Sequence, residues 1–276
     1  MCRLLAWAAR DARTCAEALG AEDLDGFTEL SRQHADGWGT AWYPPDEDAA
    51  DHPPTIKRST RCAADDPRFA ELTLGARSDA GFVHLRWATP GLPVVIANTH
   101  PFVHGQLAFA HNGAIHPQGR LDDILPAGWR TQMHGTTDSE RYFLAVAARL
   151  AEGASVLESV GDVVRRIFAD FEPTSLNAML LAPDALYVIS AHDPARVPPM
   201  GASSGGTSSS TQPDTGFYDL HLRMRGDSMV VASSGFAQPA EEGWEPLESM
   251  ALLRIERGTL RTSVDSLTPA TVPLPR

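Results

Sequence analysis

The sequence predicts an α+β fold, and three observations support this class. Short apolar runs typical of β-strands lie near both ends of the chain, and two amphipathic helix patterns lie between them. No G-x-G-x-x-G motif opens a helix and no P-loop is present, so a nucleotide-binding fold has little support. The 276 residues, 43% of them hydrophobic and 21% charged, suffice for a packed core in one large domain or two small ones.

The first part of the chain reads as strand, helix, strand and loop. Residues 3–9 are an apolar run that predicts a short buried strand, which would hold the preceding residue at a fixed place. Leucine and phenylalanine recur at helical spacing over residues 16–33. Residues 37–43, rich in tryptophan and glycine, predict a second strand, and the acids and prolines of residues 44–54 predict a surface loop.

The middle and end of the chain continue with strands around a helical centre. Residues 82–88 and 107–111 read as core strands, and residues 139–150 have the spacing of an amphipathic helix. Asp138 stands near the start of that helix, where a carboxylate suits the helix dipole. A second helix is predicted over residues 156–171. Four further strands are expected at 176–181, 186–190, 229–232 and 251–255.

These elements predict one domain over residues 2–265, followed by a tail of residues 266–276. Residues 201–216 are rich in glycine, serine and threonine, which is typical of a flexible insertion. No internal repeat is evident in the sequence.

The composition of the chain limits the binding partners and the cellular compartment that we expect. The net charge of −12, from 23 basic and 35 acidic residues, argues against nucleic acid or an anionic membrane as partner. No apolar run approaches the ~18 residues of a membrane span. The three cysteines, Cys2, Cys15 and Cys62, lack metal-ligand spacing and suit a reducing compartment, so we expect a cytoplasmic protein.

Cys2 is the first candidate for chemistry. Removal of Met1 would place a thiol and a free α-amine on the same carbon. An α-amine has a pKa of about 7.7–8.0, so it can act as a base near neutrality. Such a pair is an activated nucleophile. The alternative is that Cys2 simply packs in a strand, as many buried cysteines do.

Arg86 ends a predicted strand and should be partly buried, so it needs an anionic partner. That partner is either an internal carboxylate or the carboxylate of a substrate, which a guanidinium can clamp in a bidentate manner. Asn112 and Gly113 follow another strand and form either a simple tight turn or an oxyanion hole. Asp138 is either a helix-end carboxylate or a receptor for a substrate ammonium group.

Together these groups fit a substrate with an α-carboxylate, an α-ammonium and a scissile side-chain carbonyl. Glutamine, or another γ-glutamyl amide, is the simplest molecule of this kind.

Several motifs stand in a recognisable order. Residues 86–89 read Arg-Trp-Ala-Thr, residues 111–113 read His-Asn-Gly, and residues 137–140 read Thr-Asp-Ser-Glu. With Cys2 after Met1, this set resembles the class II glutamine amidotransferases, which are N-terminal nucleophile hydrolases. Residues 36–39 and 98–102 resemble the stand-alone branch of that family, which includes the γ-glutamyl hydrolase of ergothioneine biosynthesis. The resemblance implies a four-layer αββα sandwich of two antiparallel sheets.

The resemblance also implies roles for the matched residues. Cys2 would be the nucleophile, and Asn112 with Gly113 would form the oxyanion hole. The α-carboxylate would be held by Arg86 and Thr89. Asp138 would take the α-amine, and further pocket positions would be Gly37, His100 and Trp38, the last being a pocket wall or a core residue. No cofactor or metal is expected.

Two departures separate this chain from the best-known members. Arg3 stands where many have glycine, and Pro90 stands where the best-known members have histidine. We expect no synthase domain on this chain to receive ammonia. Either water is the acceptor and a γ-glutamyl group is removed from a larger conjugate, or ammonia passes to a separate synthase partner.

Two hypotheses place the protein in another functional class: a metal-binding protein or a non-catalytic binding module. The metal-binding hypothesis rests on histidines that are close in sequence, and residues 100 and 104 have the spacing of a pair of metal ligands. Pro101 argues against a helix there, so two rings need not share a face. The candidate ligands are His84, His100, His104, His111 and His116.

Overall fold

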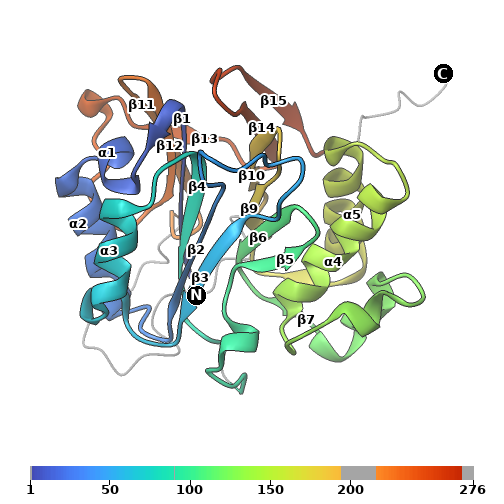
Figure 1. Cartoon of the computed structure of the whole chain (residues 1–276). Coiled ribbons are helices and arrows are strands. Elements are labelled where there is room, and N and C mark those ends of the chain that lie inside the picture. Colours follow the sequence, from blue (N-terminus) through green and yellow to red (C-terminus); the bar gives the residue numbers. More distant parts are fainter. Residues whose placement is uncertain (1, 90, 194–215, 269–276) are drawn as a thin grey trace.

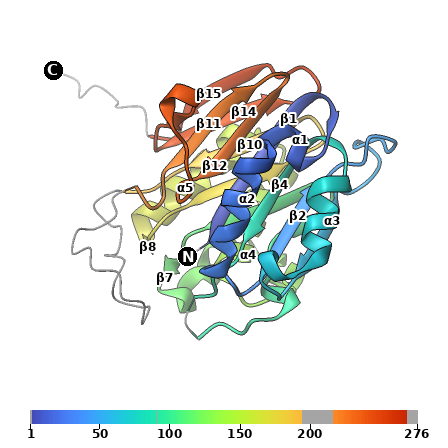
Figure 2. The same ribbon diagram turned by 90° about the vertical axis from the view of Figure 1, so that its left-hand side faces the viewer.

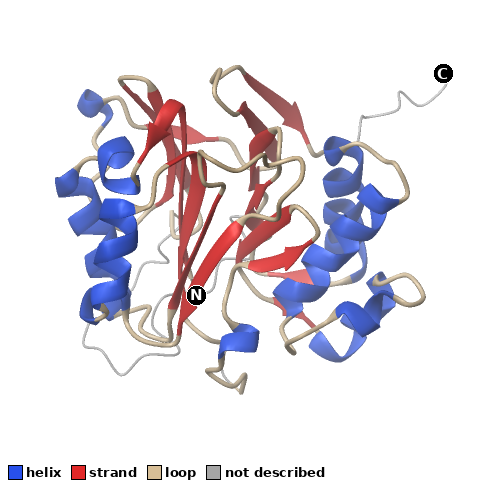
Figure 3. Cartoon of the chain, in the orientation of Figure 1, coloured by secondary structure: helices blue, strands red, loops and turns tan. Residues whose placement is uncertain are grey.

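The computed structural model describes residues 2–89, 91–193 and 216–268 of the chain. It has four layers, in which two antiparallel sheets pack face to face and each carries helices on its outer side (Figures 1 and 3). The predicted α+β class and the αββα arrangement are both confirmed. Among the described residues, the helices are too short or too polar to span a bilayer.

The first sheet has seven strands with β1 at its centre. Its central pairs are antiparallel, with Leu5 opposite Ala232 on one side and opposite Val83 on the other. In spatial order the strands are β13 (Glu245–Leu247), β11 (Leu220–Arg225), β12 (Ser228–Ser233), β1 (Arg3–Arg13), β4 (Ser78–Leu85), β2 (Trp38–Trp42) and β3 (Thr55–Ser59).

The second sheet has six strands and packs against the first. In spatial order these are β15 (Thr262–Ser266), β14 (Ala251–Glu256), β10 (Ala185–Ser190), β9 (Asn177–Leu181), β6 (Leu107–Asn112) and β5 (Phe102–His104). A separate two-stranded ribbon joins β7 (Ile115–His116) to β8 (Glu172–Pro173).

Five α-helices form the two outer layers of the described chain. The helices α1 (Cys15–Leu19), α2 (Ala21–Glu29) and α3 (Pro67–Gly75) lie on the outer face of the first sheet, and Figure 2 shows them in front of it. The helices α4 (Asp138–Ala151) and α5 (Val156–Asp170) lie on the outer face of the second sheet (Figure 1). Thr14, Thr137 and Ser155 each begin a helix by accepting a backbone N–H with the side-chain oxygen.

Three apolar clusters fill the spaces between the four layers. One lies between the sheets and includes Leu4, Phe82 and Val188, while α4 and α5 pack on the second sheet through residues such as Phe143. The third lies under the first three helices and includes Phe27. Alternate residues of β1 therefore point into two different clusters, as the period of a strand requires.

The predicted core strands and the two long helices are confirmed, with boundaries shifted by a few residues. The helix predicted over residues 16–33 is instead two helices, because Gly20 interrupts it at φ 100°. The helix α3 was not predicted from the sequence, and neither were the short or peripheral strands β3, β5, β7, β8, β11, β13 and β15. Apart from Gly216, the predicted insertion at 201–216 lies outside the described residues.

Candidate active site

Cys2 lies where the ends of the two sheets meet. It directly precedes β1 in the centre of the first sheet, and its backbone nitrogen donates to Oδ1 of Asn112, the last residue of β6, at 3.0 Å. The Sγ atom accepts a hydrogen bond from the Trp87 N–H at 3.4 Å. Burial raises the pKa of the Cys2 thiol, and the Trp87 N–H and the Arg86 guanidinium oppose that rise.

The turn after β6 presents two hydrogen-bond donors close to Cys2. Asn112 is fully buried, and its Nδ2 atom has no hydrogen-bond partner among the described residues. A buried donor left unpaired costs free energy, which points to a ligand that supplies the acceptor. The neighbouring residue must be glycine, because a Cβ atom on Gly113 would lie 2.0 Å from the Ser175 carbonyl oxygen. The turn can therefore offer an amide side chain and a backbone N–H to one oxyanion.

Arg86 follows β4 and is only 2% exposed. Its guanidinium donates to two carbonyl oxygens, of Asp36 at 3.4 Å and of Pro93 at 3.3 Å. In the described ranges no carboxylate forms an ion pair with it; the Asp36 carboxylate accepts the Ala88 N–H and acts on Arg86 only as a nearby negative charge. Burial lowers the pKa of Arg86, and the nearby Cys2 and Asp36 counter this effect. The hypothesis that an internal carboxylate forms an ion pair with Arg86 is thus not supported, and an anionic ligand would complete the contacts of the guanidinium.

Asp138 is the first residue of α4, after the N-cap Thr137. Its Oδ2 atom accepts the Ile115 N–H at 2.8 Å. The helix dipole favours a carboxylate at this end of a helix. The bond to Ile115 fixes the orientation of the carboxylate, and it leaves the Oδ1 atom able to accept a hydrogen bond from a cationic group.

One narrow cavity brings most of the sequence-predicted site residues together. Its walls include Cys2, Arg86, Thr89, His100, Gly113 and Asp138. The cavity has a volume of only about 20 Å³, and a thiol, a cation, an anion and Gly113 of the oxyanion turn (residues 112–113) surround it.

Three of the predicted site residues are not among those that line this cavity: Asn112, which contacts the Cys2 nitrogen through its Oδ1 atom, Trp38 and Gly37. Trp38 faces the helix layer, where its ring packs against Phe69 and its Nε1 atom donates to Asp66. The prediction that Trp38 is a pocket wall is therefore wrong, and its alternative, a core residue, holds, because the side chain projects from the outer face of β2. Gly37 acts through its backbone, since its carbonyl oxygen accepts the Arg86 N–H at 2.8 Å. Its φ of 130° and a Cβ clash of 2.4 Å with the Ser59 carbonyl oxygen exclude other residues there.

The histidines do not assemble into a metal site. No group of three or more histidine, cysteine, aspartate or glutamate side chains among the described residues could hold a metal ion. The rings of His84 and His100 pack together at 4.2 Å between centroids, whereas His104 packs on Trp129. His111 bonds the Ser175 carbonyl oxygen and the Ser139 hydroxyl, each at 2.9 Å. Because a carbonyl oxygen can only accept, Nε2 carries a proton; burial lowers the pKa of His111 and so favours the neutral ring, in which Nδ1 accepts from the hydroxyl.

We expect acid to destabilise the fold through the histidine pair. Burial lowers the pKa of His84 and of His100 well below the usual value. As the pH falls through about 6.5, the unfolded chain gains protons that the folded chain does not, so the free energy of unfolding decreases. The loss is at most about 1.4 kcal/mol per pH unit for each ring and continues until the folded-state pKa is reached. Urea denaturation from neutral pH to about pH 5 measures it.

Two variants test the origin of this acid sensitivity. His84→Leu should flatten the dependence of the unfolding free energy on pH. His52→Gln, which removes an exposed imidazole, should leave it unchanged. Equal slopes in wild type and His84→Leu would show that the pair is not responsible.

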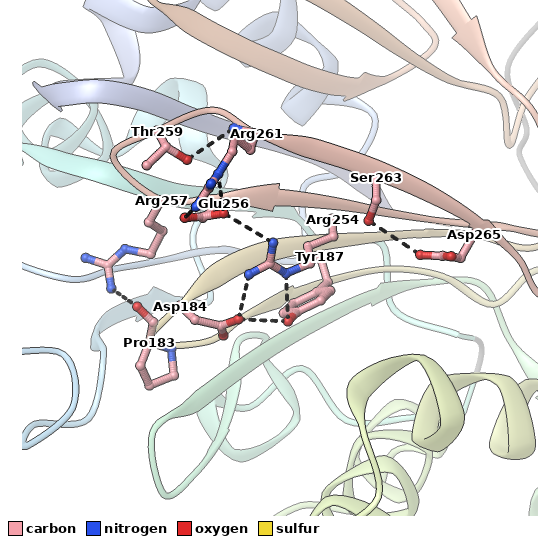
Figure 4. A network of polar contacts seen from close by, with 10 residues as sticks. All are labelled: Pro183, Asp184, Tyr187, Arg254, Glu256, Arg257, Thr259, Arg261, Ser263 and Asp265. Carbon is pink, nitrogen blue, oxygen red and sulfur yellow. Dashed lines mark hydrogen bonds and ion pairs between the residues drawn. The ribbon is translucent and has the colours of Figure 1, made fainter.

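A larger and more open depression, of about 490 Å³, lies elsewhere on the sandwich. Its arginines pair with acidic side chains, as Figure 4 shows for Arg254, which binds Asp184 and the Tyr187 hydroxyl. Arg257 is likewise held by Asp79. Because these groups already have partners, the smaller cavity at Cys2 is the better candidate site.

For some residues that shape the cavity, the sequence predicted no role. Trp87 contributes its backbone N–H to the thiol, and Asn98 binds the Thr136 N–H at 2.8 Å and so holds the loop before α4. Glu140 accepts two backbone N–H groups of the same loop, from residues 134 and 135. The motifs at residues 86–89, 98–102 and 137–140 already contained these three residues, but their roles depend on contacts that the motifs do not show.

Comparison with known proteins decides the family. A family model described as class II glutamine amidotransferases matches residues 1–191, which is more than half of the 276 residues. The chain belongs to this family. Membership in this class of amidotransferases indicates an enzyme.

The relatives of this amidotransferase chain differ in the fraction of each protein that aligns with it. The γ-glutamyl-hercynylcysteine sulfoxide hydrolase of Mycobacterium tuberculosis (strain CDC 1551 / Oshkosh) is 25% identical over 276 residues, covering 96% of this chain and 97% of that protein. A probable glutamine amidotransferase of Saccharomyces cerevisiae is 29% identical over 129 residues. That match covers 44% of this chain, and the chain spans only 36% of the yeast protein. A glutamine–fructose-6-phosphate aminotransferase of Brucella suis is 36% identical over 91 residues, 33% of this chain and 15% of that enzyme.

Solved structures agree with this family at the level of the fold. A class II glutamine aminotransferase domain protein from Silicibacter pomeroyi superposes with a TM-score of 0.62 at 17% identity, covering 97% of this chain and 100% of that one. The glutamine phosphoribosylpyrophosphate amidotransferase of Bacillus subtilis gives a TM-score of 0.60 at 15% identity, over 96% of this chain and 49% of that one. The four layers are therefore those of the class II amidotransferase fold.

Proposed function

We propose that this amidotransferase-family chain is an N-terminal cysteine amidohydrolase. It cleaves the γ-amide of glutamine or of a γ-glutamyl conjugate through a γ-glutamyl thioester and releases glutamate. The contact of 3.0 Å between the Cys2 nitrogen and Asn112 Oδ1 carries the proposal. It brings the nitrogen of the nucleophile residue to the oxyanion turn, in a cavity that also contains Arg86 and Asp138.

The first half of the reaction forms the thioester. With Met1 removed, the α-amine of Cys2 takes the thiol proton and the sulfur attacks the γ-carbonyl carbon. The C–N bond of the amide then breaks, and the leaving amine takes its proton from the α-ammonium of Cys2.

The second half of the reaction hydrolyses the thioester. The α-amine of Cys2 deprotonates a water molecule, which attacks the thioester carbon. The C–S bond breaks, the sulfur takes the proton back from the α-ammonium, and glutamate and the free thiol result.

The oxyanion turn stabilises the charge that develops in both steps. Asn112 Nδ2 and the Gly113 N–H donate to the γ-oxygen as it becomes negative. The Oδ1 atom of Asn112 meanwhile accepts from the Cys2 nitrogen and holds it near the thiol. Removal of a single donor of this type costs about 3–4 kcal/mol of transition-state stabilisation.

The opposite end of the substrate is a zwitterion. Arg86 binds the α-carboxylate together with Thr89, and Asp138 binds the α-ammonium through the oxygen that Ile115 leaves unbound. Fixing that end converts attack on the carbonyl into an effectively unimolecular step, which lowers the entropic part of the barrier.

We expect Arg86→Lys to raise KM for a γ-glutamyl substrate by about 10- to 100-fold, with a smaller effect on kcat. Lysine keeps the positive charge but cannot make a bidentate contact with a carboxylate. Steady-state kinetics measures the two constants separately. Arg77→Lys, which alters an exposed arginine paired with Glu17, is the matched control. A normal KM in Arg86→Lys would remove this arginine from the substrate site.

The acceptor of the γ-glutamyl group is water in this proposal. The mycobacterial relative, which this chain matches over 97% of its length, is a γ-glutamyl conjugate hydrolase by name, and this favours a conjugate as substrate. The second candidate is a glutaminase subunit that passes ammonia to a separate synthase, since other relatives are, by name, a probable glutamine amidotransferase and a glutamine–fructose-6-phosphate aminotransferase.

Two measurements test the proposal. Intact mass spectrometry after brief exposure to 6-diazo-5-oxo-norleucine should show a single adduct on Cys2 of a chain that lacks Met1. Purified protein should release glutamate from a γ-glutamyl conjugate without any added protein. Labelling at another residue contradicts the nucleophile assignment, and ammonia release that requires a second protein favours the synthase-coupled reading.

A further inference from the structure

The backbone after Asn112 is held by hydrogen bonds at successive residues. The Ala114 N–H donates to the Thr174 hydroxyl at 2.9 Å, and the Thr174 N–H donates to the Ala114 carbonyl oxygen at 2.8 Å. The next N–H, of Ile115, donates to Asp138. Thr174 therefore fixes both polar groups of the residue that directly follows Gly113.

The Thr174 hydroxyl is itself oriented by Tyr218. The phenol of Tyr218 donates to Thr174 Oγ1 at 2.9 Å, and the side chain is fully buried. Burial raises the pKa of Tyr218 to about 12, so the phenol remains a neutral donor at physiological pH. The tyrosine is also held through its backbone, because its carbonyl oxygen accepts from Asn177 Nδ2 at 2.5 Å.

The residue before Tyr218 connects this segment to the nucleophile strand. The Arg3 guanidinium donates to the Phe217 carbonyl oxygen at 3.1 Å and lies 3.9 Å from the centre of the Phe217 ring. Residues 217 and 218 therefore contact the residue after Cys2 on one side and Thr174 on the other.

We propose that Tyr218 is a positioning residue for the oxyanion turn, acting on the Ala114 peptide through the Thr174 hydroxyl. The phenol keeps the Thr174 hydroxyl oriented so that it accepts the Ala114 N–H. This fixes the peptide that follows Gly113, which limits the φ and ψ angles that Gly113 can adopt and so restricts the direction of the Gly113 N–H. The phenol of Tyr218 is directed at Thr174, and Tyr218 is not among the residues that line the cavity at Cys2, so it acts without touching the substrate.

The inference rests on the proposed function, since it assigns a role within that reaction. An oxyanion donor must lie about 2.7–3.1 Å from the place where the negative oxygen forms. A displacement of about 1 Å can cost up to about 100-fold in rate. Arg86 is held by contacts outside this turn, and Asp138, although it accepts from Ile115, is also fixed as the first residue of α4, so substrate binding should change less than the chemical step.

The test uses the full-length protein and a γ-glutamyl anilide as chromogenic probe. Tyr218→Phe, which removes only the hydroxyl, should lower kcat by about 10- to 100-fold with less than about a twofold change in KM. Thr174→Val should act likewise, and Thr174→Ser, which keeps a hydroxyl, should recover most of kcat. The double variant Tyr218→Phe/Thr174→Val should be no slower than Thr174→Val, because both changes break one chain of contacts.

Tyr187→Phe is the matched control. It removes the hydroxyl of another largely buried tyrosine, whose partners Asp184 and Arg254 lie in the paired network of Figure 4. It should leave kcat and KM unchanged, and the melting temperatures of all variants report folding.

The outcomes are separable. Unchanged kcat in Tyr218→Phe overturns the positioning role and leaves the proposed function intact. Additive losses in the double variant, or a Thr174→Ser enzyme as slow as Thr174→Val, also overturn it. An inactive wild type on the probe and on glutamine instead contradicts the proposed function itself.

Discussion

Replacement of Cys2 by alanine is expected to reduce turnover of a γ-glutamyl substrate by at least about 10⁴-fold, the scale on which loss of a nucleophile acts. The variant keeps the nitrogen that contacts Asn112 and the cavity formed by Arg86 and Asp138. It loses only the atom that would form the thioester. Glutamate should therefore still bind, and isothermal titration calorimetry alongside a turnover assay separates the two effects.

Cys62→Ala is the control for this experiment. Cys62 is partly exposed, lies outside the cavity, and contacts Ser31 through its sulfur. Its loss should leave turnover unchanged and should not prevent labelling by 6-diazo-5-oxo-norleucine. Retention of more than about one per cent of activity in Cys2→Ala would rule out a covalent role for this thiol.

The second large effect is expected for Asn112→Asp, which should lower kcat by about 10²- to 10³-fold with little change in KM. The substitution preserves shape and keeps an oxygen that can accept from the Cys2 nitrogen. It removes the Nδ2 donor, which has no hydrogen-bond partner among the described side chains and backbone. It also places a negative charge where the oxyanion must form. The expected loss therefore appears in the chemical step, which single-turnover kinetics measures directly.

Gln33→Glu controls for the change of an amide to an acid, because residue 33 is exposed and outside the cavity. It should behave as wild type. If Asn112→Asp also retains its kcat while binding glutamate normally, the amide group is not an oxyanion donor, and the turn is only a structural hairpin.

The sequence predicted the centre of the fold better than its edges. The apolar runs at 3–9 and 107–111 became β1 and β6, because a strand buried on both faces must be apolar along its length. The edge strands β3 and β15 are partly exposed or exposed, so their sequences carry little apolar signal. The helix α3 was missed for a similar reason, since its cap Asp66 and first-turn proline lie in a stretch without an extended apolar pattern.

For the site, motif order was informative about residue type but not about orientation. The residues that begin or end central strands, such as Cys2, Arg86 and Asn112, do meet in one region. Trp38 does not, because a strand residue points to either face of its sheet and nothing in the local pattern showed which face met the second sheet. Tyr218 was not singled out, since its partner Thr174 is 44 residues away along the chain.

The sequence by itself determined the chemical groups available: a cysteine that processing can expose, an arginine and an aspartate at the ends of elements, and an Asn-Gly turn. Only the tertiary structure decided that these groups share a cavity, that the arginine has carbonyl rather than carboxylate partners, and that the asparagine keeps an unused donor. The physical reason is distance along the chain. The bond between Cys2 and Asn112 joins residues 110 positions apart, and it forms because two sheets pack face to face with those ends aligned.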